Sequence, residues 1–309
     1  MTLDKSYLEY ENRSLGMDHD RYDFSNMFER KPVSWPDGKK VALWITVSLE
    51  YFPLVPNDGP FKAPGHMVTP YPDYRTYTTR DYGNRVGVFR ILKVLDKLGL
   101  KASFPMNSEI ATRYPSLLKE ITDRGHEVVA HGENMNKIHF GGMAKNTEAE
   151  QINNCVKTLR EKSGQGVTGW QSPARSQSEN TPDLLVTSGL GYVCDWVNDD
   201  MPYYMRAKTG TIIAMPHTME LEDRNLLVTL GQSEEVYKEQ ILAAFSQFQR
   251  EAMAENGRVL HLALTPYVIG QPWRIRTLVE TLQAIADSGD IWSATGGEIA
   301  AIWDSQQTS

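Results

Sequence analysis

Short apolar runs alternate with amphipathic stretches along most of this chain. Residues 41–49 (VALWITVSL) form an apolar, β-branched run that ends at the acid Glu50, which is the pattern of a buried parallel strand with chemistry at its carboxyl end. In residues 85–98 apolar positions recur at helical spacing and Gly99 follows them, which predicts a helix. By the same criteria we predict strands at 101–105, 127–131, 166–172, 192–195, 211–216, 259–264 and 291–293, and helices at 114–124, 147–162, 181–188, 233–255, 273–287 and 297–303.

This alternation predicts a parallel α/β architecture. No repeat or low-complexity linker divides residues 41–309, so we expect one catalytic domain there. Residues 1–40 are polar with little periodicity, and we expect an arm that lies over a surface, either its own subunit's or a neighbour's. Prolines and glycines crowd residues 53–72, which predicts a long loop of the kind that usually serves function.

Composition narrows the classes of partner. The chain has 309 residues and a net charge of −7 without a basic stripe, which argues against nucleic-acid and anionic-membrane partners. It has no apolar run long enough to span a bilayer and no secretory signal at its start, so we expect a cytoplasmic protein. Cys155 and Cys194 are then expected to be free, buried thiols.

Polar residues follow the predicted strands. In a parallel α/β barrel the carboxyl ends of the strands meet at one rim, and active sites lie there. No glycine-rich phosphate fingerprint follows any strand, which argues against a dinucleotide cofactor. Acids, histidines, amides and aromatic residues on one rim suit a small polar substrate and hydrolytic chemistry. The rim candidates are Ser48, Glu50, His131, Asn134, Ser172, Asp195, His217, Glu220, Thr265 and Tyr267.

Five segments, in order, resemble the polysaccharide deacetylase (nodulation-deacetylase-like) superfamily. They are GHEVVAHG (125–132), GWQSPARSQSENTPDLL (169–185), YVCDWVNDDMPY (192–203), IAMPHTMELED (213–223) and LTPYVIGQPWRIRTL (264–278). The branch they resemble holds cofactor-independent allantoinase and cyclic-imide hydrolases. The resemblance implies an irregular (β/α)7-type barrel that follows the N-terminal arm. It also implies a homo-oligomer, either a dimer or a tetramer.

The resemblance also indicates which residues could bind a metal ion. Metal-dependent members of the superfamily hold a divalent ion with Asp-His-His, and they use a further Asp as base and a late His as acid. In this chain the base position falls on Ser48, the metal Asp on Glu50, the first metal His on His131, the second on Met135 and the late His on Thr265. The resemblance therefore leaves two alternatives. The protein uses no cofactor, or it binds one divalent metal ion, with zinc as the first candidate, through Glu50, His131 and a third ligand that is unknown. The candidates for that ligand are Glu133, Asn134, His139 and a rim acid.

Three functions stay open at this stage. In the first, the chain hydrolyses a C–N bond of a small cyclic amide, imide or ureide, with Glu50 as base, His131 orienting water or donating a proton, and Asp195 orienting them. In the second, it is a metal-dependent N-deacetylase of an amino sugar. In the third, it cleaves another bond, such as a lactone or carbon–carbon bond, or only binds a ligand. The candidates for substrate binding are Ser48, Asn134, Trp170, Ser172, Arg175, His217, Glu220, Thr265 and Tyr267.

Overall fold

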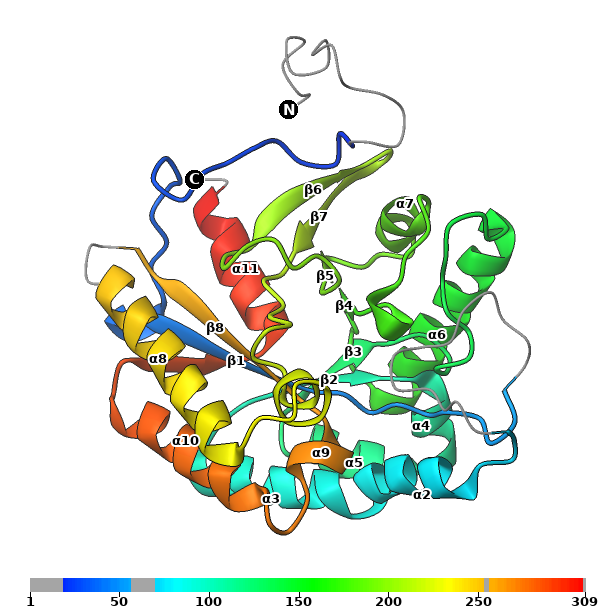
Figure 1. Ribbon diagram of the computed structural model, residues 1–309. Helices are drawn as coiled ribbons and strands as arrows, with labels where there is room; N and C mark the ends of the chain where they lie inside the picture. The colour runs from blue at the N-terminus through cyan, green and yellow to red at the C-terminus, as the bar shows by residue number, and fades with distance from the viewer. Residues whose placement is uncertain (1–18, 57–69, 253–255, 308–309) are drawn as a thin grey trace.

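The computed structural model describes residues 19–56, 70–252 and 256–307, in which one sheet forms the centre of the molecule (Figure 1). The sheet has nine strands in the order β6-β7-β5-β4-β3-β2-β1-β8, with β9 also paired to β1. Every pairing is parallel except that of β6 with β7. The strands are β1 (Val41–Val47), β2 (Ser103–Met106), β3 (Glu127–Ala130), β4 (Gly169–Trp170), β5 (Tyr192–Val193), β6 (Tyr203–Ala207), β7 (Gly210–Ala214), β8 (Arg258–Leu264) and β9 (Ile291–Ala294).

Helices surround this sheet and join its parallel strands (Figure 1). They are α2 (Tyr74–Tyr82), the π-helical η2 (Gly83–Gly87), α3 (Val88–Leu98), α4 (Ser108–Arg113), α5 (Pro115–Asp123), α6 (Lys145–Ser163), α7 (Thr181–Thr187), α8 (Glu234–Ala252), α9 (Pro266–Ile269), α10 (Ile275–Asp287) and α11 (Gly296–Gln307), with the short segments η1 (Pro36–Gly38), η3 (Pro173–Arg175) and η4 (Arg224–Thr229). No pairing joins β8 to β6 among the described strands, so the predicted irregular barrel is confirmed as a half-barrel.

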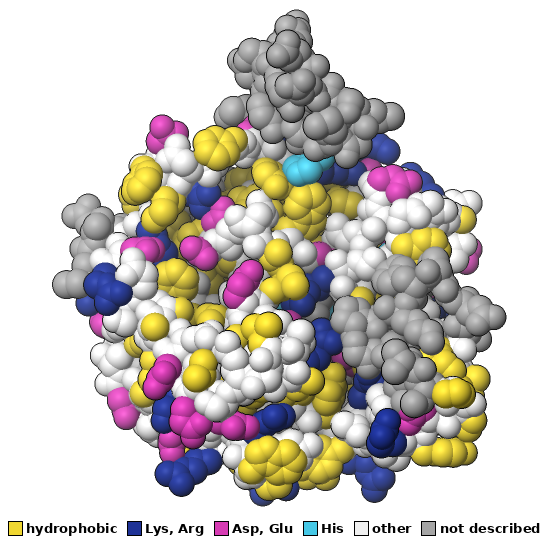
Figure 2. All heavy atoms as spheres, viewed as in Figure 1, with side chains coloured by type: hydrophobic (Ala, Val, Ile, Leu, Met, Phe, Trp, Pro, Cys, Tyr) yellow, Lys and Arg dark blue, Asp and Glu magenta, His cyan; other side chains and the backbone are white. Residues whose placement is uncertain are grey.

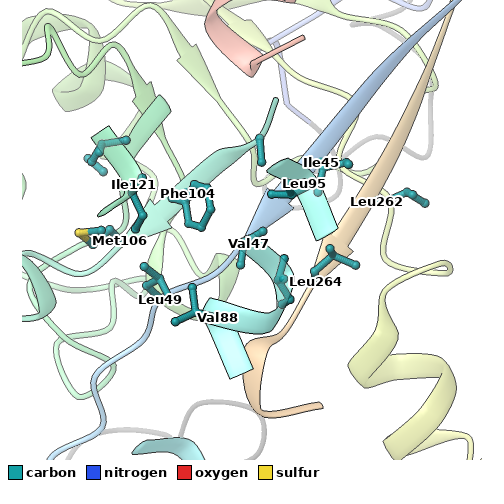
Figure 3. Packing of buried hydrophobic residues seen from close by; sticks show 14 of the residues in the cluster. Ile45, Val47, Leu49, Val88, Leu95, Phe104, Met106, Ile121, Leu262 and Leu264 are labelled. Carbon is teal, nitrogen blue, oxygen red and sulfur yellow. The ribbon is translucent and has the colours of Figure 1, made fainter. Parts of the chain in front are cut away.

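The alternation of side chains along β1 divides the core into two clusters. Leu43, Ile45 and Val47 point to one face of the sheet, where they pack with α3, β2 and β8 (Figure 3). Ala42 and Trp44 point to the other face and belong to the cluster that α11 completes with Ile299 and Trp303. The strand is buried along its whole length, as its continuous apolar run predicts.

The helix predicted at 85–98 is longer than its apolar stripe indicates. Asp73 caps α2 by accepting a hydrogen bond from the Thr76 backbone nitrogen at 3.1 Å, and the helical path continues through η2 into α3. A glycine is required at position 87, because a Cβ there would lie 2.0 Å from the Pro266 carbonyl oxygen. This close approach packs η2 against α9 and places the polar helix α2 beside the rim.

Other predicted elements are confirmed with shifted ends, and some elements were missed. The antiparallel hairpin of β6 with β7 and the short helices α4 and α9 were not predicted. Within the predicted loop 53–72, residues 57–69 lie outside the described residues, and the rest of it contains no helix or strand. Cys155 and Cys194 are buried and unpaired, as expected. None of the helices in the described ranges combines the length and the apolar character that a bilayer span requires.

The described part of the N-terminal arm packs on its own chain. Trp35 is buried against Trp292 with ring centroids 5.6 Å apart, and its indole nitrogen donates to the Arg258 carbonyl at 2.9 Å. Arg21 forms an ion pair with Asp183 at 2.7 Å. Residues 19–40 therefore belong to the same packed unit as the barrel, and an intersubunit role for the arm stays a prediction.

Candidate active site

Glu50 and His131 meet at the carboxyl ends of β1 and β3. The strands bring them together because Ser48 N donates to the Leu264 carbonyl at 3.1 Å and His131 N to the Met106 carbonyl at 3.1 Å, which aligns the ends of β8, β1, β2 and β3. His131 Nε2 lies 3.5 Å from Glu50 Oε1, and the Glu50 side chain is 22% exposed while that of His131 is 1% exposed. A water molecule could hydrogen-bond to both atoms at this separation.

A backbone carbonyl fixes the tautomer of His131. Its Nδ1 lies 2.8 Å from the carbonyl oxygen of Gln171, the residue that follows β4. A carbonyl oxygen only accepts, so Nδ1 carries a proton and donates it. In the neutral ring the lone pair is therefore on Nε2, and in the protonated ring Nε2–H is the charged donor that faces Glu50. Sequence analysis did not single out Gln171, since a backbone contact leaves no mark in the side-chain pattern.

The pKa of Glu50 reflects opposing effects. Burial raises it, but the hydrogen bond and charge of His131 and the positive charges of Arg224 and Arg80 together bring it below the ordinary value of 4.5. Glu50 is therefore ionised at neutral pH and can accept a proton. Arg224 and Arg80 were missed by sequence analysis, because Arg224 follows an irregular loop and Arg80 lies inside the polar helix α2.

A second histidine faces the same pocket. Arg175 Nη1 donates to His217 Nδ1 at 3.0 Å, and because a guanidinium only donates, the proton of the neutral ring is on Nε2. Burial, followed by His261, Arg175 and His131, holds the pKa of His217 well below 6.5. The other nitrogen of the Arg175 fork forms an ion pair with Glu222 at 2.9 Å. His217 thus offers a fixed N–H donor to the pocket.

The pocket between these groups is small and polar. It has a volume of about 40 Å³ and is lined by Ser48, Glu50, His131, Gln171, Ala174, Arg175, His217, Glu222, Arg224, Ala263, Leu264 and Thr265. Five of the predicted site residues therefore join Glu50 there: Ser48, His131, Arg175, His217 and Thr265. On the face seen in Figure 2, acidic, basic and apolar side chains intermingle around a hollow near the centre.

Other predicted site residues lie elsewhere. Trp170 is fully buried in the core, where its indole nitrogen donates to Ser172 Oγ at 2.8 Å, and neither residue lines the pocket. Asn134 accepts from the Asn136 backbone nitrogen at 2.9 Å within its own turn. Glu220 lines a wider neighbouring cavity that shares His217 with the pocket. Tyr267 does not line the pocket either, and burial raises its pKa to about 12.

Asp195 holds a loop rather than facing the pocket. It accepts from the Ser172 backbone nitrogen at 2.7 Å and from Gln177 Nε2 at 2.6 Å, and burial raises its pKa above the ordinary value. The loop that it holds carries Arg175. Asp195 is therefore placed as a positioning residue, and a direct catalytic role for it stays a prediction.

The donor set around Glu50 and His131 does not fit a divalent metal. Within the described ranges, no three His, Cys, Asp or Glu side chains are grouped so that they could hold an ion. Met135, at the position of the superfamily's second histidine, is buried in an apolar cluster with Phe52 and Ile138. The guanidinium of Arg224 lines the same pocket and would repel a cation.

The proposed third ligands also lie apart from the pair. His139 stacks on Trp170 with ring centroids 5.7 Å apart, and its Nδ1 lies 3.5 Å from Glu148 Oε1. Glu133 forms an ion pair with Lys137. Neither side chain lines the pocket of Glu50 and His131. We therefore derive no step through a metal ion.

Comparison with known proteins agrees with this fold. Residues 70–193 match the family model described as polysaccharide deacetylase. This segment is similar to that family. A Schizosaccharomyces pombe protein named "Putative polysaccharide deacetylase" is 24% identical to it over 306 residues, which is 89% of this chain and 95% of that protein. The peptidoglycan deacetylase of Helicobacter pylori is 30% identical over 127 residues, 40% of this chain and 42% of that protein.

A solved structure resembles the domain over nearly its whole length. The crystal structure of PuuE allantoinase superposes with a TM-score of 0.80 at 22% identity, covering 92% of this chain and 98% of that chain. At this identity the likeness establishes the shared fold. This shared fold and the match of residues 70–193 agree with the superfamily predicted from the five sequence segments.

Proposed function

We propose that this protein hydrolyses a C–N bond in a small cyclic amide, imide or ureide. The observation that carries the proposal is the pair of Glu50 and His131, a carboxylate and an imidazole 3.5 Å apart in a pocket whose described residues offer no metal-binding donor set. Deacetylases and allantoinases, the classes named among the relatives, are hydrolases that act on C–N bonds other than peptide bonds. The pocket is small and lined mainly by polar side chains, which favours a small polar substrate over a polymer.

The residues of the pocket can carry the reaction in two steps. Ionised Glu50 removes a proton from water as the water oxygen forms a bond with the ring carbonyl carbon, and the carbonyl oxygen becomes an oxyanion. His217 Nε2–H is available to donate to this oxyanion. The C–N bond then breaks, and the ring nitrogen receives the proton from Glu50 by way of His131. The products are a carboxyl group and, on the same open chain, an amine nitrogen from a cyclic amide, an amide nitrogen from an imide or a urea nitrogen from a ureide.

Turnover of a defined panel tests the proposal. The purified protein is incubated with allantoin, hydantoin, succinimide and dihydrouracil, and ring opening is followed by loss of ring absorbance and by mass. We expect turnover of at least one of these rings. If no amide, imide or ureide is opened at micromolar enzyme, the proposed function is wrong.

A second candidate is metal-dependent N-deacetylation of an amino sugar. The names of the relatives in Schizosaccharomyces pombe and Helicobacter pylori favour it. Two donors, Glu50 and His131, fall short of the three protein ligands that a hydrolytic zinc site ordinarily has. Release of acetate from N-acetylglucosamine oligomers, together with stoichiometric Zn, Co, Mn or Ni in the active protein, would favour this candidate over ring opening.

A further inference from the structure

His261 is a buried histidine of β8 whose two ring nitrogens both have partners. Its Nδ1 lies 2.9 Å from the Thr218 backbone nitrogen, and its Nε2 lies 3.0 Å from Thr46 Oγ1 in β1. A backbone N–H only donates, so Nδ1 accepts, and the proton of the neutral ring is on Nε2. His261 therefore donates to Thr46 and at the same time holds the backbone of Thr218.

Burial keeps His261 in this neutral form. The side chain is 1% exposed, and burial, together with the positive charge of Arg175, lowers its pKa to about 3. Protonation would place a hydrogen on Nδ1 against the Thr218 N–H and would break that hydrogen bond. Near neutral pH the ring is therefore neutral and the bond to Thr218 is kept.

Thr218 belongs to the turn after β7, which brings His217 to the pocket. Met215 N donates to the Val193 carbonyl at the end of β5 at 2.8 Å, and His217 N then donates to the Met215 carbonyl at 2.8 Å. In the described part of the sheet no pairing joins β7 to β8. The bond from Thr218 to His261 thus ties the turn to β8 at a place where no strand pairing does so.

The imidazole rings of His261 and His217 are also in contact. Their centroids lie 4.3 Å apart, and the indole of Trp44 lies 4.3 Å from the His261 ring. Arg175 donates to Nδ1 of His217 at 3.0 Å. His217 is therefore restrained at one nitrogen by Arg175, and through its ring and its turn by His261, while its Nε2–H remains available to the pocket.

We propose that His261 is a positioning residue that holds His217 Nε2–H where the oxyanion of the reaction forms. This inference rests on the proposed hydrolysis of a cyclic amide, imide or ureide, in which His217 donates to that oxyanion. His261 itself does not line the pocket. Its effect is on kcat more than on substrate binding, because the oxyanion is formed only after water attacks the carbonyl.

Three substitutions of His261 separate its two hydrogen bonds. In His261→Asn the side-chain oxygen can take the place of Nδ1 and accept from Thr218, whereas in His261→Gln the longer amide reaches the place of Nε2 beside Thr46. His261→Leu keeps neither bond. On the best substrate of the cyclic panel, we expect kcat to fall about 10- to 100-fold in His261→Gln and His261→Leu with KM nearly unchanged. His261→Asn should recover most of this loss.

His126 provides a matched control. It is 3% exposed, its Nδ1 accepts from the Ala102 backbone nitrogen at 3.3 Å, and it does not line the pocket. His126→Leu should lower the melting temperature, as His261→Leu does, but leave kcat and KM unchanged. An equal fall of kcat in His126→Leu and His261→Leu, or no recovery in His261→Asn, would mark His261 as structural and overturn the positioning role.

A spectroscopic measurement tests the assignment without turnover. In protein with ¹⁵N-labelled histidine, the His217 signal, identified by its loss in His217→Gln, should report a single Nε2–H tautomer near neutral pH. We expect His261→Leu to lose this single tautomer, because the turn can then move away from Arg175, and His261→Asn to keep it. An unchanged tautomer in His261→Leu would overturn the positioning role. If the wild type opens no ring but this tautomer is lost, the proposed reaction is wrong and the positioning of His217 by His261 is supported.

Discussion

Neighbouring charged side chains keep the carboxylate of Glu50 ionised, although burial alone would raise its pKa. Burial raises its pKa, while His131, Arg224 and Arg80 lower it below 4.5 in sum. If the reaction requires ionised Glu50, activity is complete above pH 4.5 and is lost as the pH falls through the lowered pKa. The acid limb of the pH–rate profile therefore lies below pH 4.5.

Removing a positive charge next to Glu50 should shift the acid limb of the pH–rate profile. In Arg224→Gln the pKa of Glu50 loses one of the effects that lower it, so we expect the acid limb of kcat/KM to shift to higher pH. The profile of Arg124→Gln, an arginine that pairs with Asp96 and Glu120 away from the pocket, should match wild type. An acid limb that stays in place in Arg224→Gln would show that Glu50 does not control it.

Residues that follow a predicted strand within a few positions could be predicted from the sequence, whereas Arg80 and Arg224 could not. Glu50, His131 and His217 each follow an apolar run, and parallel strands bring such positions to one rim. Arg80 and Arg224 reach the same place from a helix and from η4, where no periodicity distinguishes a site residue from a surface one. Trp170 and Ser172 were misplaced because position after a strand does not tell whether a side chain points into the pocket or into the core.

At the scale of elements, the turn after β3 is what holds His131 in place. Gly132 has φ of 67°, and a Cβ there would lie 2.4 Å from Pro173 Cγ. We expect Gly132→Ala to lower the free energy of unfolding by about 1–3 kcal/mol and to reduce kcat as the turn shifts His131. Urea denaturation and steady-state rates check both effects.

A second glycine provides the control for that substitution. Gly141 has open space where its Cβ would lie, so Gly141→Ala should behave like wild type. If Gly132→Ala is as stable and as active as Gly141→Ala, the turn does not constrain His131.

The elements themselves could be predicted where the apolar pattern is strong. Strand β1 and helix α3 show clear periodicities and lie close to where these place them. Helix α2 has the sequence YRTYTTRDY, with only Arg80 buried, and it exists because Asp73 caps it and η2 anchors it on α9. Strand β6 is a half-buried hairpin partner of β7, and its alternation is masked by aromatic and basic residues on its open face.

At the scale of the whole molecule, one packed unit surrounds both cysteines. Burial raises the pKa of Cys155 to about 12 and that of Cys194 well above 9.0. Neither thiol should react with an aromatic disulfide reagent at pH 8 in the native protein, and both should react once the protein is unfolded in guanidinium chloride. Rapid reaction of the native protein would show that the core opens more readily than its packing indicates.

The order of elements was enough to predict a parallel α/β barrel, but not how the barrel is completed. The sheet is open between β6 and β8 in the described strands, and α11 packs across the exposed face through Ile299 and Trp303. That contact joins residues far apart in the sequence, and local patterns do not record it.

The most direct test of the account is the rate of ring opening with Glu50 neutralised. On the best substrate of the cyclic panel, Glu50→Gln should lower kcat/KM by about 10²–10⁴-fold without loss of folded structure. Glu133→Gln, which changes a rim glutamate paired with Lys137, should retain the wild-type rate. Equal ring-opening rates for Glu50→Gln and wild type would contradict the assignment of Glu50 as the base.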